Sequence, residues 1–294
     1  MSKDEFVGEV DSVKITVLMD DYSGFIPDIL AQHGISIILD LISGNVSKRI
    51  LFDAGQSAEP ILYNMKQLKI LPESIDMVIL SHCHQDHTSG LVGILKNINR
   101  EIPIVAHPSI FKCKVACTPF LRYSGISNKN SKEEIIKNGG NLILIKEPLR
   151  IMDGVFTTGE IERKTDFELF GKDRYVIENG SKITDTSLDD ISLAINIKGK
   201  GLLIVTGCSH SGIINIVNQV SKISGMDNVF GILGGMHLIE SSPEIIDKTI
   251  TNLANKNIKF IAPGHCTGIN AINRLIEHFD SKVDALHSGK VIFL

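Results

Sequence analysis

Apolar and polar positions follow two patterns along this chain. Short runs rich in Val, Ile and Leu, bounded by turn residues, predict strands, and segments with apolar residues three or four positions apart predict amphipathic helices. The predicted strands are residues 13–18, 35–42, 49–52, 75–80, 190–197, 201–205, 228–233 and 258–262. The predicted helices are residues 60–69, 90–98, 213–223, 242–256 and 269–279.

This alternation of strands and helices predicts the α/β (α+β) class. No internal repeat or linker divides the chain, so residues 1–294 are predicted to form a single domain. Residues 109–188 are the least regular part and are rich in Lys, Asn and Gly. Long irregular segments in compact proteins commonly shape binding sites. We therefore expect an insertion or cap over one end of the core in this region.

Histidines follow the predicted strands in a recurring arrangement. An apolar strand, then small residues, then a histidine is found at His82, His210, His237 and His265, and in a weaker form at His107. Binding sites in α/β sheets form beyond the carboxyl ends of strands. A single histidine there more often caps a turn, but four crowded together gain nothing in packing. Because neutral imidazole is the commonest metal ligand, this arrangement predicts a metal site.

The segment 81–90 gives the prediction its detail. His82 and His84 are two residues apart on an extended loop, so both side chains can project to one side and chelate one ion. Asp86 and His87 follow where the chain turns toward a helix, and they point to a second, adjacent position. Imidazole together with carboxylate suits zinc, manganese or iron.

Composition narrows the classes of function and partner. The apolar fraction of 43% supports a large core, and a net charge of −4 gives no reason to expect nucleic acid or an anionic membrane as partner. No apolar run approaches the roughly 20 residues of a membrane span, and the polar N-terminus lacks a signal-peptide pattern. With five cysteines and no export signal, a disulfide framework is not expected. We expect a cytoplasmic protein acting on a small molecule, with homo-oligomerisation left open.

The spacing of the cluster resembles a known family. His82, His84, Asp86 and His87 match the H-x-H-x-D-H motif of the metallo-β-lactamase superfamily, and the resemblance covers nearly the whole chain. Asp53 resembles the family's first-motif carboxylate, which supports the metal loop without binding metal. The resemblance implies a four-layer αβ/βα sandwich with the site at one edge.

Further strings resemble the branch of this superfamily that contains dihydropterin–ribofuranosylaminobenzene-phosphate synthases. These strings are residues 33–36, 158–161, 207–210, 234–238 and 264–268. The superfamily usually has an Asp that bridges both metals at the end of a later strand, and Cys208 stands at this place, with His210 two residues on. Whether Cys208 is a ligand, a bridge or a bystander stays open.

The resemblance implies two divalent ions, zinc first and manganese or iron as alternatives. His210 would complete the first site with His82 and His84, and Asp86, His87 and His265 would hold the second ion. Asp86 could also orient a nucleophile, and His237 is a candidate for substrate contact or proton transfer. His107 is expected to be structural.

Three functions fit these residues. The first is hydrolysis or group transfer on a small phosphorylated or ester-like substrate by metal-activated water. The second, implied by the branch, is condensation of a pterin diphosphate with a ribosyl-aminobenzene phosphate. The third is an iron-dependent redox or sensor protein in which Cys208 tunes the metal.

Overall fold

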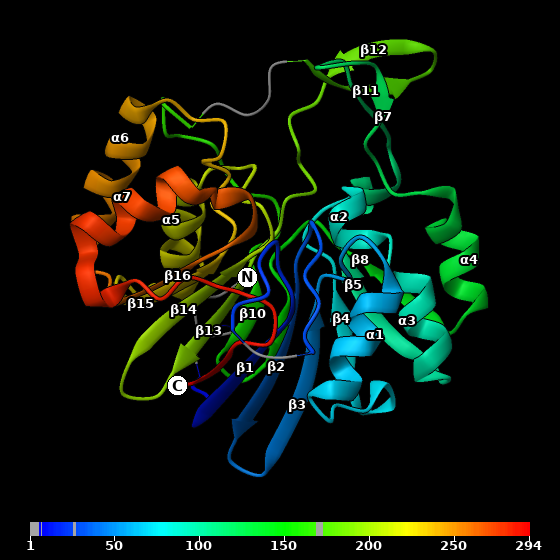
Figure 1. Ribbon diagram of the computed structural model, residues 1–294, viewed down its shortest axis with the longest axis horizontal. Coiled ribbons are helices and arrows are strands. Elements are labelled where there is room, and N and C mark those ends of the chain that lie inside the picture. Colours follow the sequence, from blue (N-terminus) through cyan, green and yellow to red (C-terminus); the bar gives the residue numbers. More distant parts are fainter. Residues whose placement is uncertain (1–5, 7, 26–27, 169–172) are drawn as a thin grey trace.

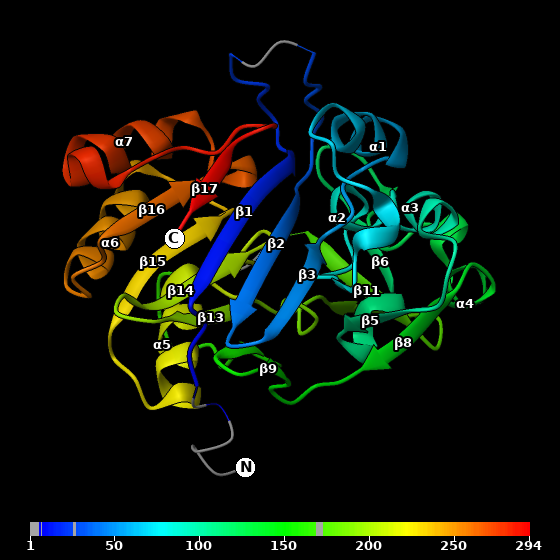
Figure 2. The same ribbon diagram turned by 90° about the horizontal axis from the view of Figure 1, so that it is seen from below.

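Two large β-sheets pack face to face, and helices cover the outer face of each (Figures 1 and 2). This computed structural model describes residues 6, 8–25, 28–168 and 173–294. Figure 1 shows helices α5, α6 and α7 beside one sheet and α1, α3 and α4 beside the other. The layers are therefore helix, sheet, sheet and helix, and the predicted αβ/βα sandwich is confirmed.

The first sheet has the strand order β17-β1-β2-β3-β4-β5-β8. Its strands are β17 (Val291–Phe293), β1 (Ser12–Met19), β2 (Ser36–Ser43), β3 (Val46–Phe52), β4 (Met77–Ile79), β5 (Ile102–Ala106) and β8 (Gly140–Leu144). The pairs from β17 to β3 are antiparallel, and those from β3 to β8 are parallel. The helices of this half are α1 (Ala58–Gln67), α2 (Gln85–Thr88), α3 (Leu91–Ile98) and α4 (Lys132–Lys137).

The second sheet has the strand order β16-β15-β14-β13-β10-β9. Its strands are β16 (Phe260–Pro263), β15 (Val229–Gly234), β14 (Gly201–Thr206), β13 (Leu193–Ile197), β10 (Val155–Thr157) and β9 (Arg150–Met152). Its helices are α5 (Ile213–Ser224), α6 (Pro243–Ala254) and α7 (Ile269–Phe279). Short 3₁₀ helices lie at Pro72–Ser74, Pro108–Phe111 (η3), Asn128–Asn130, His265–Thr267 (η5) and Asp280–Lys282.

Three buried clusters explain why the strands have almost continuous apolar runs. On β14, Leu203 and Val205 belong to the cluster between the two sheets, while Leu202 and Ile204 pack with α5, α6 and α7. Successive strand residues point to opposite faces, so a strand buried on both faces needs apolar residues at every position. The first sheet follows the same rule toward α1 and α3.

The predicted insertion at residues 109–188 divides into two parts, which corrects its extent. Strand β8 joins the first sheet, and β9 and β10 join the second, so these segments belong to the sandwich. The remaining strands form a separate sheet, here called the cap sheet, in the order β12-β11-β6-β7. They are β12 (Ser181–Thr184), β11 (Arg174–Glu178), β6 (Cys113–Ala116) and β7 (Arg122–Tyr123). Figure 1 shows the cap sheet standing beyond the end of the sandwich that carries α2.

Sequence patterns placed most elements within two or three residues of their observed bounds. Helix α7 has the predicted limits, whereas α1 begins two residues before the predicted start, with Pro60 inside its first turn. A proline is tolerated there because the first amide groups of a helix have no intrahelical acceptor. In the described part of the chain, no helix combines the length and apolar character needed to cross a membrane.

Candidate metal centre

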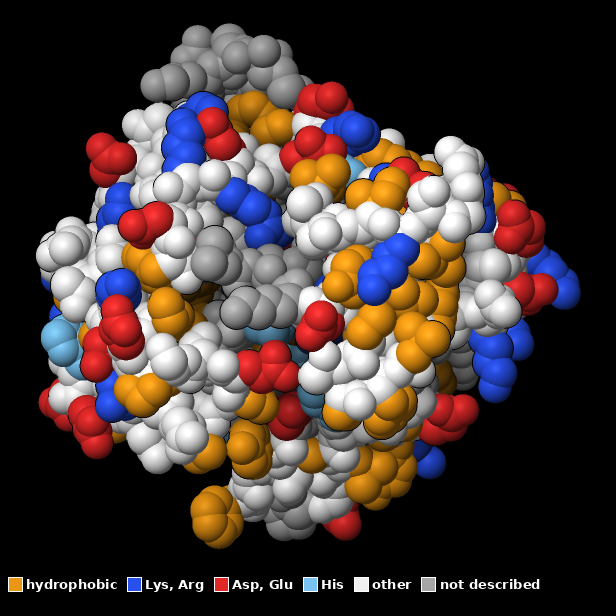
Figure 3. Space-filling view, turned by 90° about the horizontal axis from the view of Figure 1, so that it is seen from above, with side chains coloured by type: hydrophobic (Ala, Val, Ile, Leu, Met, Phe, Trp, Pro, Cys, Tyr) orange, Lys and Arg blue, Asp and Glu red, His pale blue; other side chains and the backbone are white. Residues whose placement is uncertain are grey.

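Segments that follow three separate strands, β4, β14 and β16, meet at one edge of the sandwich. The loop after β4 carries His82 and His84, and α2 carries Asp86 and His87. The loop after β14 carries Cys208 and His210, and the 3₁₀ helix after β16 begins at His265. Each of these strands pairs in parallel with a neighbour in its own sheet, and binding sites form beyond the carboxyl ends of such strands. Figure 3 views the end that carries the cap sheet and shows histidine side chains at the bottom of a hollow.

His82, His84 and His210 form the first group. The Nε2 atom of His210 lies 3.1 Å from His82 Nε2 and 3.0 Å from His84 Nδ1, and the latter two atoms are 3.0 Å apart. One proton can serve only one pair among three mutually facing nitrogens. Three nitrogens that each lie about 2.0–2.1 Å from a tetrahedral zinc are about 3.3 Å from one another. The three nitrogens of this group would therefore need to move apart only slightly to bind such an ion.

Burial keeps the first group neutral. Desolvation lowers the pKa of His82 and of His210 well below the ordinary value, and lowers that of His84 to about 3. The positive charges of Arg174 and Lys114 act in the same direction on His84. A neutral imidazole has a lone pair to give to a cation, so these rings are prepared to bind metal at neutral pH.

Asp86, His87 and His265 form the second group. Asp86 Oδ2 lies 3.3 Å from His87 Nε2 and 3.2 Å from His265 Nε2. The rings of His82 and His87 have centroids 4.1 Å apart, so the two groups adjoin. The six residues predicted to bind metal are thus brought together in the two predicted groups.

Carboxylates hold the second group's histidines from behind. Asp53 Oδ2 lies 2.7 Å from His87 Nδ1, and Asp53 also accepts hydrogen bonds from the amide and hydroxyl of Ser81. Asp21 Oδ1 lies 2.9 Å from His265 Nδ1. A carboxylate on the far ring nitrogen fixes the tautomer and orients the other nitrogen, the usual arrangement behind metal-binding histidines. The supporting role predicted for Asp53 agrees with these contacts.

Charge separates the second group from the first. Burial disfavours the protonated form of His87, but Asp86 and Asp53 outweigh it and raise its pKa to about 9. The pKa of His265 is likewise raised, against burial, by Cys266, Asp21 and Asp86. In the metal-free protein these rings are therefore protonated at neutral pH, and a bound cation would replace their protons.

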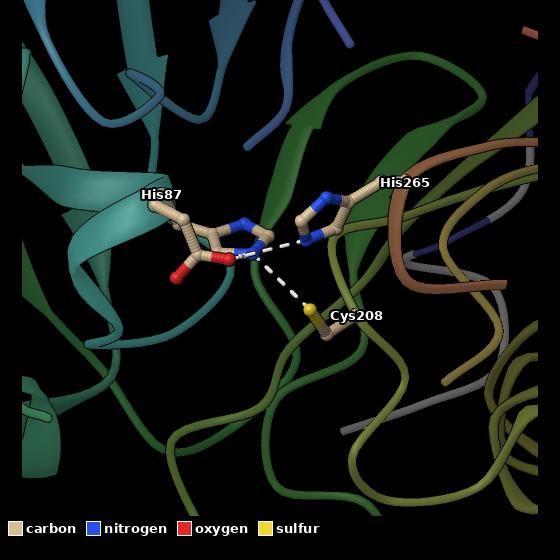
Figure 4. Close-up of side chains that lie close together, drawn as sticks. His87, Cys208 and His265 are labelled. Atoms are coloured by element: carbon tan, nitrogen blue, oxygen red, sulfur yellow. Dashed lines mark hydrogen bonds and ion pairs between the residues drawn. The ribbon is translucent and has the colours of Figure 1, made fainter. Parts of the chain in front are cut away.

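Cys208 lies where the two groups meet. Its Sγ is 3.1 Å from His87 Nε2, and Figure 4 shows His87, Cys208 and His265 pointing toward one another. The ligand atoms of Cys208 with Asp86, His87 and His265 lie within 4.8 Å of one another, and so do those of Cys208 with His82 and His210. Burial raises the pKa of the Cys208 thiol well above its ordinary value, so its thiolate needs a neighbouring cation.

The backbone of this edge adopts sparsely populated conformations. Asp53, Ser209, His237 and His265 all have positive φ angles, of 59°, 64°, 47° and 46° respectively. Such conformations cost non-glycine residues about 1–3 kcal/mol each and persist where the surroundings enforce them. Their concentration at the ends of these strands marks the edge as a built site.

A cavity of about 390 Å³ opens onto both groups. The His237 ring, predicted to take part in catalysis, lines this cavity with its centroid 4.4 Å from that of His210. His33 also lines it, with Nδ1 3.0 Å from Asp21 Oδ2.

His107 lies apart from the cavity. Its Nε2 is 2.9 Å from Glu160, and its Nδ1 accepts a hydrogen bond from the amide of Ser109. His107 does not line this cavity, so its structural role stays a prediction with which these contacts agree.

Several residues of the site are not among those that the sequence pattern predicts. Asp21 lies two residues after the end of β1, so its place beyond a strand is the same kind of sequence signal as that of the histidines. Lys114 gave no signal, because a lysine on a short strand is normally exposed. Here it is buried and pairs with Asp185 and Asp189, and Asp189 accepts from the amide of Cys83. All five cysteines are free, as expected.

An αβ/βα sandwich with a buried cluster of His, Asp and Cys at one edge defines a class of metal-dependent enzymes. Residues 48–118 match the family described as the β-lactamase superfamily domain. The chain is 47% identical to the 7,8-dihydropterin-6-methyl-4-(β-D-ribofuranosyl)-aminobenzene-5′-phosphate synthase of Methanocaldococcus jannaschii, over 97% of this chain and 98% of the relative. It is 34% identical to an uncharacterised protein of the same organism, over 95% of this chain and 99% of that protein.

Among solved structures, Tm1679, described as a metal-dependent hydrolase of the β-lactamase superfamily, superposes with a TM-score of 0.79. The two chains are 26% identical, and the superposition covers 95% of this chain and 98% of the other. This chain belongs to the metallo-β-lactamase superfamily, in the branch of the M. jannaschii synthase. It is accordingly an enzyme of that superfamily, and the membership that the sequence motifs predicted is confirmed.

Proposed function

We propose that the chain is a dinuclear metalloenzyme that acts on a small phosphorylated substrate. The observation that carries this proposal is the pair of adjoining donor groups, one of three neutral imidazoles and one of carboxylate and imidazoles, open to a single cavity. In this proposal His82, His84 and His210 hold the first ion, and Asp86, His87 and His265 hold the second. Zinc is the expected metal, because nitrogen, oxygen and thiolate donors together suit it.

Two such ions, held by these residues, would lower the pKa of a bound water and polarise a phosphoryl or carbonyl oxygen. The chain's own residues do the rest. Asp86 Oδ2 is one of the donor atoms of the second group. Because Asp86 also lines the cavity, its carboxylate can orient a nucleophile there. His237 lines the cavity beside His210 and is placed to give a proton to a leaving atom or take one from an attacking atom.

The relative's name favours one reaction within this class. A synthase whose product joins a dihydropterin to a ribofuranosyl-aminobenzene phosphate performs group transfer, and this chain is 47% identical to it over almost its whole length. We therefore add, as second candidate, condensation of a pterin diphosphate with a ribosyl-aminobenzene phosphate. Here the metal centre would hold the diphosphate leaving group.

The free cysteines support the predicted cytoplasmic location, since that compartment keeps thiols reduced.

Product analysis separates the two reactions. The zinc- or manganese-loaded enzyme is given both condensation substrates, and separately a bis(p-nitrophenyl) phosphate probe, and products are identified by mass spectrometry. A joined pterin product that disappears in His82→Ala supports the synthase, while release of nitrophenol alone supports hydrolysis. Neither product with metal present would contradict the proposed function. The variant His278→Ala, on the exposed face of α7, is the matched histidine control.

A further inference from the structure

Two arginines of the cap sheet line the cavity over the metal centre. Arg122 lies on β7 and Arg174 on β11, and both are lining residues of the cavity that also contacts His84, Asp86 and His210. Neither arginine belongs to a sequence motif, because they are 52 positions apart and only the folding of the cap sheet brings them together.

The strand register places both arginines on one face of the cap sheet. Ala116 on the middle strand β6 is paired with Arg122 on one side and with Arg174 on the other. Residues directly opposite in antiparallel strands point to the same face, and neighbouring strands lie about 4.8 Å apart. The two arginines therefore flank a small, buried alanine on the face that looks onto the cavity.

This face is anchored to the loop after β4, here called the metal loop, which carries His82, Cys83 and His84. Lys114 is two residues before Ala116 on β6, so its side chain leaves the same face. Its Nζ pairs with Asp185 and Asp189, and the second oxygen of Asp189 lies 2.9 Å from the amide of Cys83, between the two histidines of the loop. The position of the arginines relative to the metal centre is thus fixed through a chain of buried contacts.

The chemistry of the guanidinium group identifies a ligand. Arg122 donates to the carbonyl of Thr118 and lies 5.7 Å from the ring of Phe120, which orients its side chain. A guanidinium has five N–H donors in a planar fork that matches phosphate oxygens, so this contact leaves donors for a ligand. The cavity wall also contains Asp86 and Glu240, and a phosphate dianion entering beside these carboxylates needs compensating positive charge.

We infer that Arg122 and Arg174 bind a phosphate group of the substrate, clamping it between the cap sheet and the metal centre. This inference rests on the proposed function for its role in turnover, but anion binding by the arginines can be measured without turnover. The two residues are specificity determinants: they select substrates that carry a phosphate over otherwise identical ones that lack it.

Calorimetric titration with ribose 5-phosphate, and with ribose as the phosphate-free comparison, tests the clamp. It is carried out on zinc-loaded protein and on protein stripped with a chelator. Charge-assisted hydrogen bonds to phosphate are strong enough that Arg122→Gln and Arg174→Gln should each raise the Kd for ribose 5-phosphate on the order of tenfold or more. Arg→Lys at each position, which keeps the charge but loses the fork, should give a smaller rise.

Lys182→Gln is the matched control, because Lys182 is an exposed cation of the cap sheet that stacks on Tyr175 and does not line the cavity. Its Kd should stay within about twofold of wild type. Far-UV circular dichroism and zinc content confirm that each variant is folded. Arginine variants that bind within twofold of wild type, or a wild type that does not distinguish ribose 5-phosphate from ribose, would overturn the clamp.

The clamp and the proposed function fail in different experiments. Protein that holds no metal overturns the dinuclear centre, but the stripped protein still reports on the arginines. Conversely, arginine-independent binding in both forms overturns the clamp and leaves the metal centre standing.

Discussion

Cys208 is the residue at which the sequence resemblance predicts a departure from the usual pattern of the superfamily. It lies between the two donor groups at the place where a bridging carboxylate is expected, and its Sγ is 3.1 Å from His87 Nε2. A thiolate is a softer donor than a carboxylate and favours zinc over harder cations. Because burial raises the pKa of the free thiol, ionisation of Cys208 should accompany metal binding.

Cobalt substitution tests this role directly. We predict that the Co²⁺-loaded wild type shows an intense near-ultraviolet band from thiolate-to-metal charge transfer, and that Cys208→Ser loses this band while keeping weaker visible bands. Cys83→Ala, which removes another buried thiol on the metal loop, should retain it. A band that survives in Cys208→Ser, or one lost equally in Cys83→Ala, would rule out the thiolate ligand.

His87 makes metal binding depend on pH. With a pKa of about 9 in the metal-free protein, its ring is protonated at pH 7, and a metal ion must displace the Nε2 proton. Affinity for the second ion should therefore rise with pH by about tenfold per unit up to roughly pH 9, with release of at least one proton. Calorimetry in buffers of different ionisation enthalpy measures this release.

The variant Asp53→Asn is informative for the same prediction. It removes one of the two carboxylate charges that raise the pKa of His87. The pH dependence should then shift to lower pH. Unchanged proton release in this variant, or none in the wild type, is incompatible with a protonated His87.

At the scale of elements, strand ends carry the chemistry and the cap sheet covers it. The histidines were predictable because each follows a buried strand directly. The division of residues 109–188 between the sandwich and the cap sheet was not predictable, because the strands of this region are short and carry few apolar residues. Strand β12, Ser181–Thr184, for example, is exposed throughout. Lys114 and Asp189 were equally hidden, since they meet only after the cap sheet has formed, 75 positions apart.

The buried lysine should stabilise the cap and the metal loop together. Lys114→Met leaves Asp185 and Asp189 without their cation in a buried place, so we expect a loss of roughly 3–5 kcal/mol in the free energy of unfolding of the metal-free protein. Lys112→Met breaks an exposed ion pair with Glu178, which lies on β11 of the cap sheet. This variant should lose at most about 1 kcal/mol in the free energy of unfolding. Urea titration of both variants measures these losses. Equal losses in the free energy of unfolding would show that Lys114 contributes no more to stability than the exposed Lys112.

At the scale of the molecule, the centre joins the two halves of the sandwich. The first sheet and α2 supply His82, His84, Asp86 and His87, whereas the second sheet supplies Cys208, His210 and His265. A metal ion bound across this seam would link the halves and bind only the folded chain. Binding should therefore stabilise the protein as a whole.

Thermal unfolding should reveal this link. Free zinc at about 100 times its Kd should raise the free energy of unfolding by about 2.7 kcal/mol, which corresponds to several degrees in Tm. His265→Ala should lose most of this increase. His278→Ala, a histidine outside the centre, should keep it. A zinc effect that is equal in both variants would place the ion elsewhere.

Anomalous scattering from crystals of the zinc-loaded protein can locate the pair of metal ions proposed for the two groups. Two anomalous peaks per chain are expected, one among His82, His84 and His210 and the other among Asp86, His87 and His265, with Cys208 between them. Absence of a peak at either group, or a strong peak remote from both, would contradict this proposal.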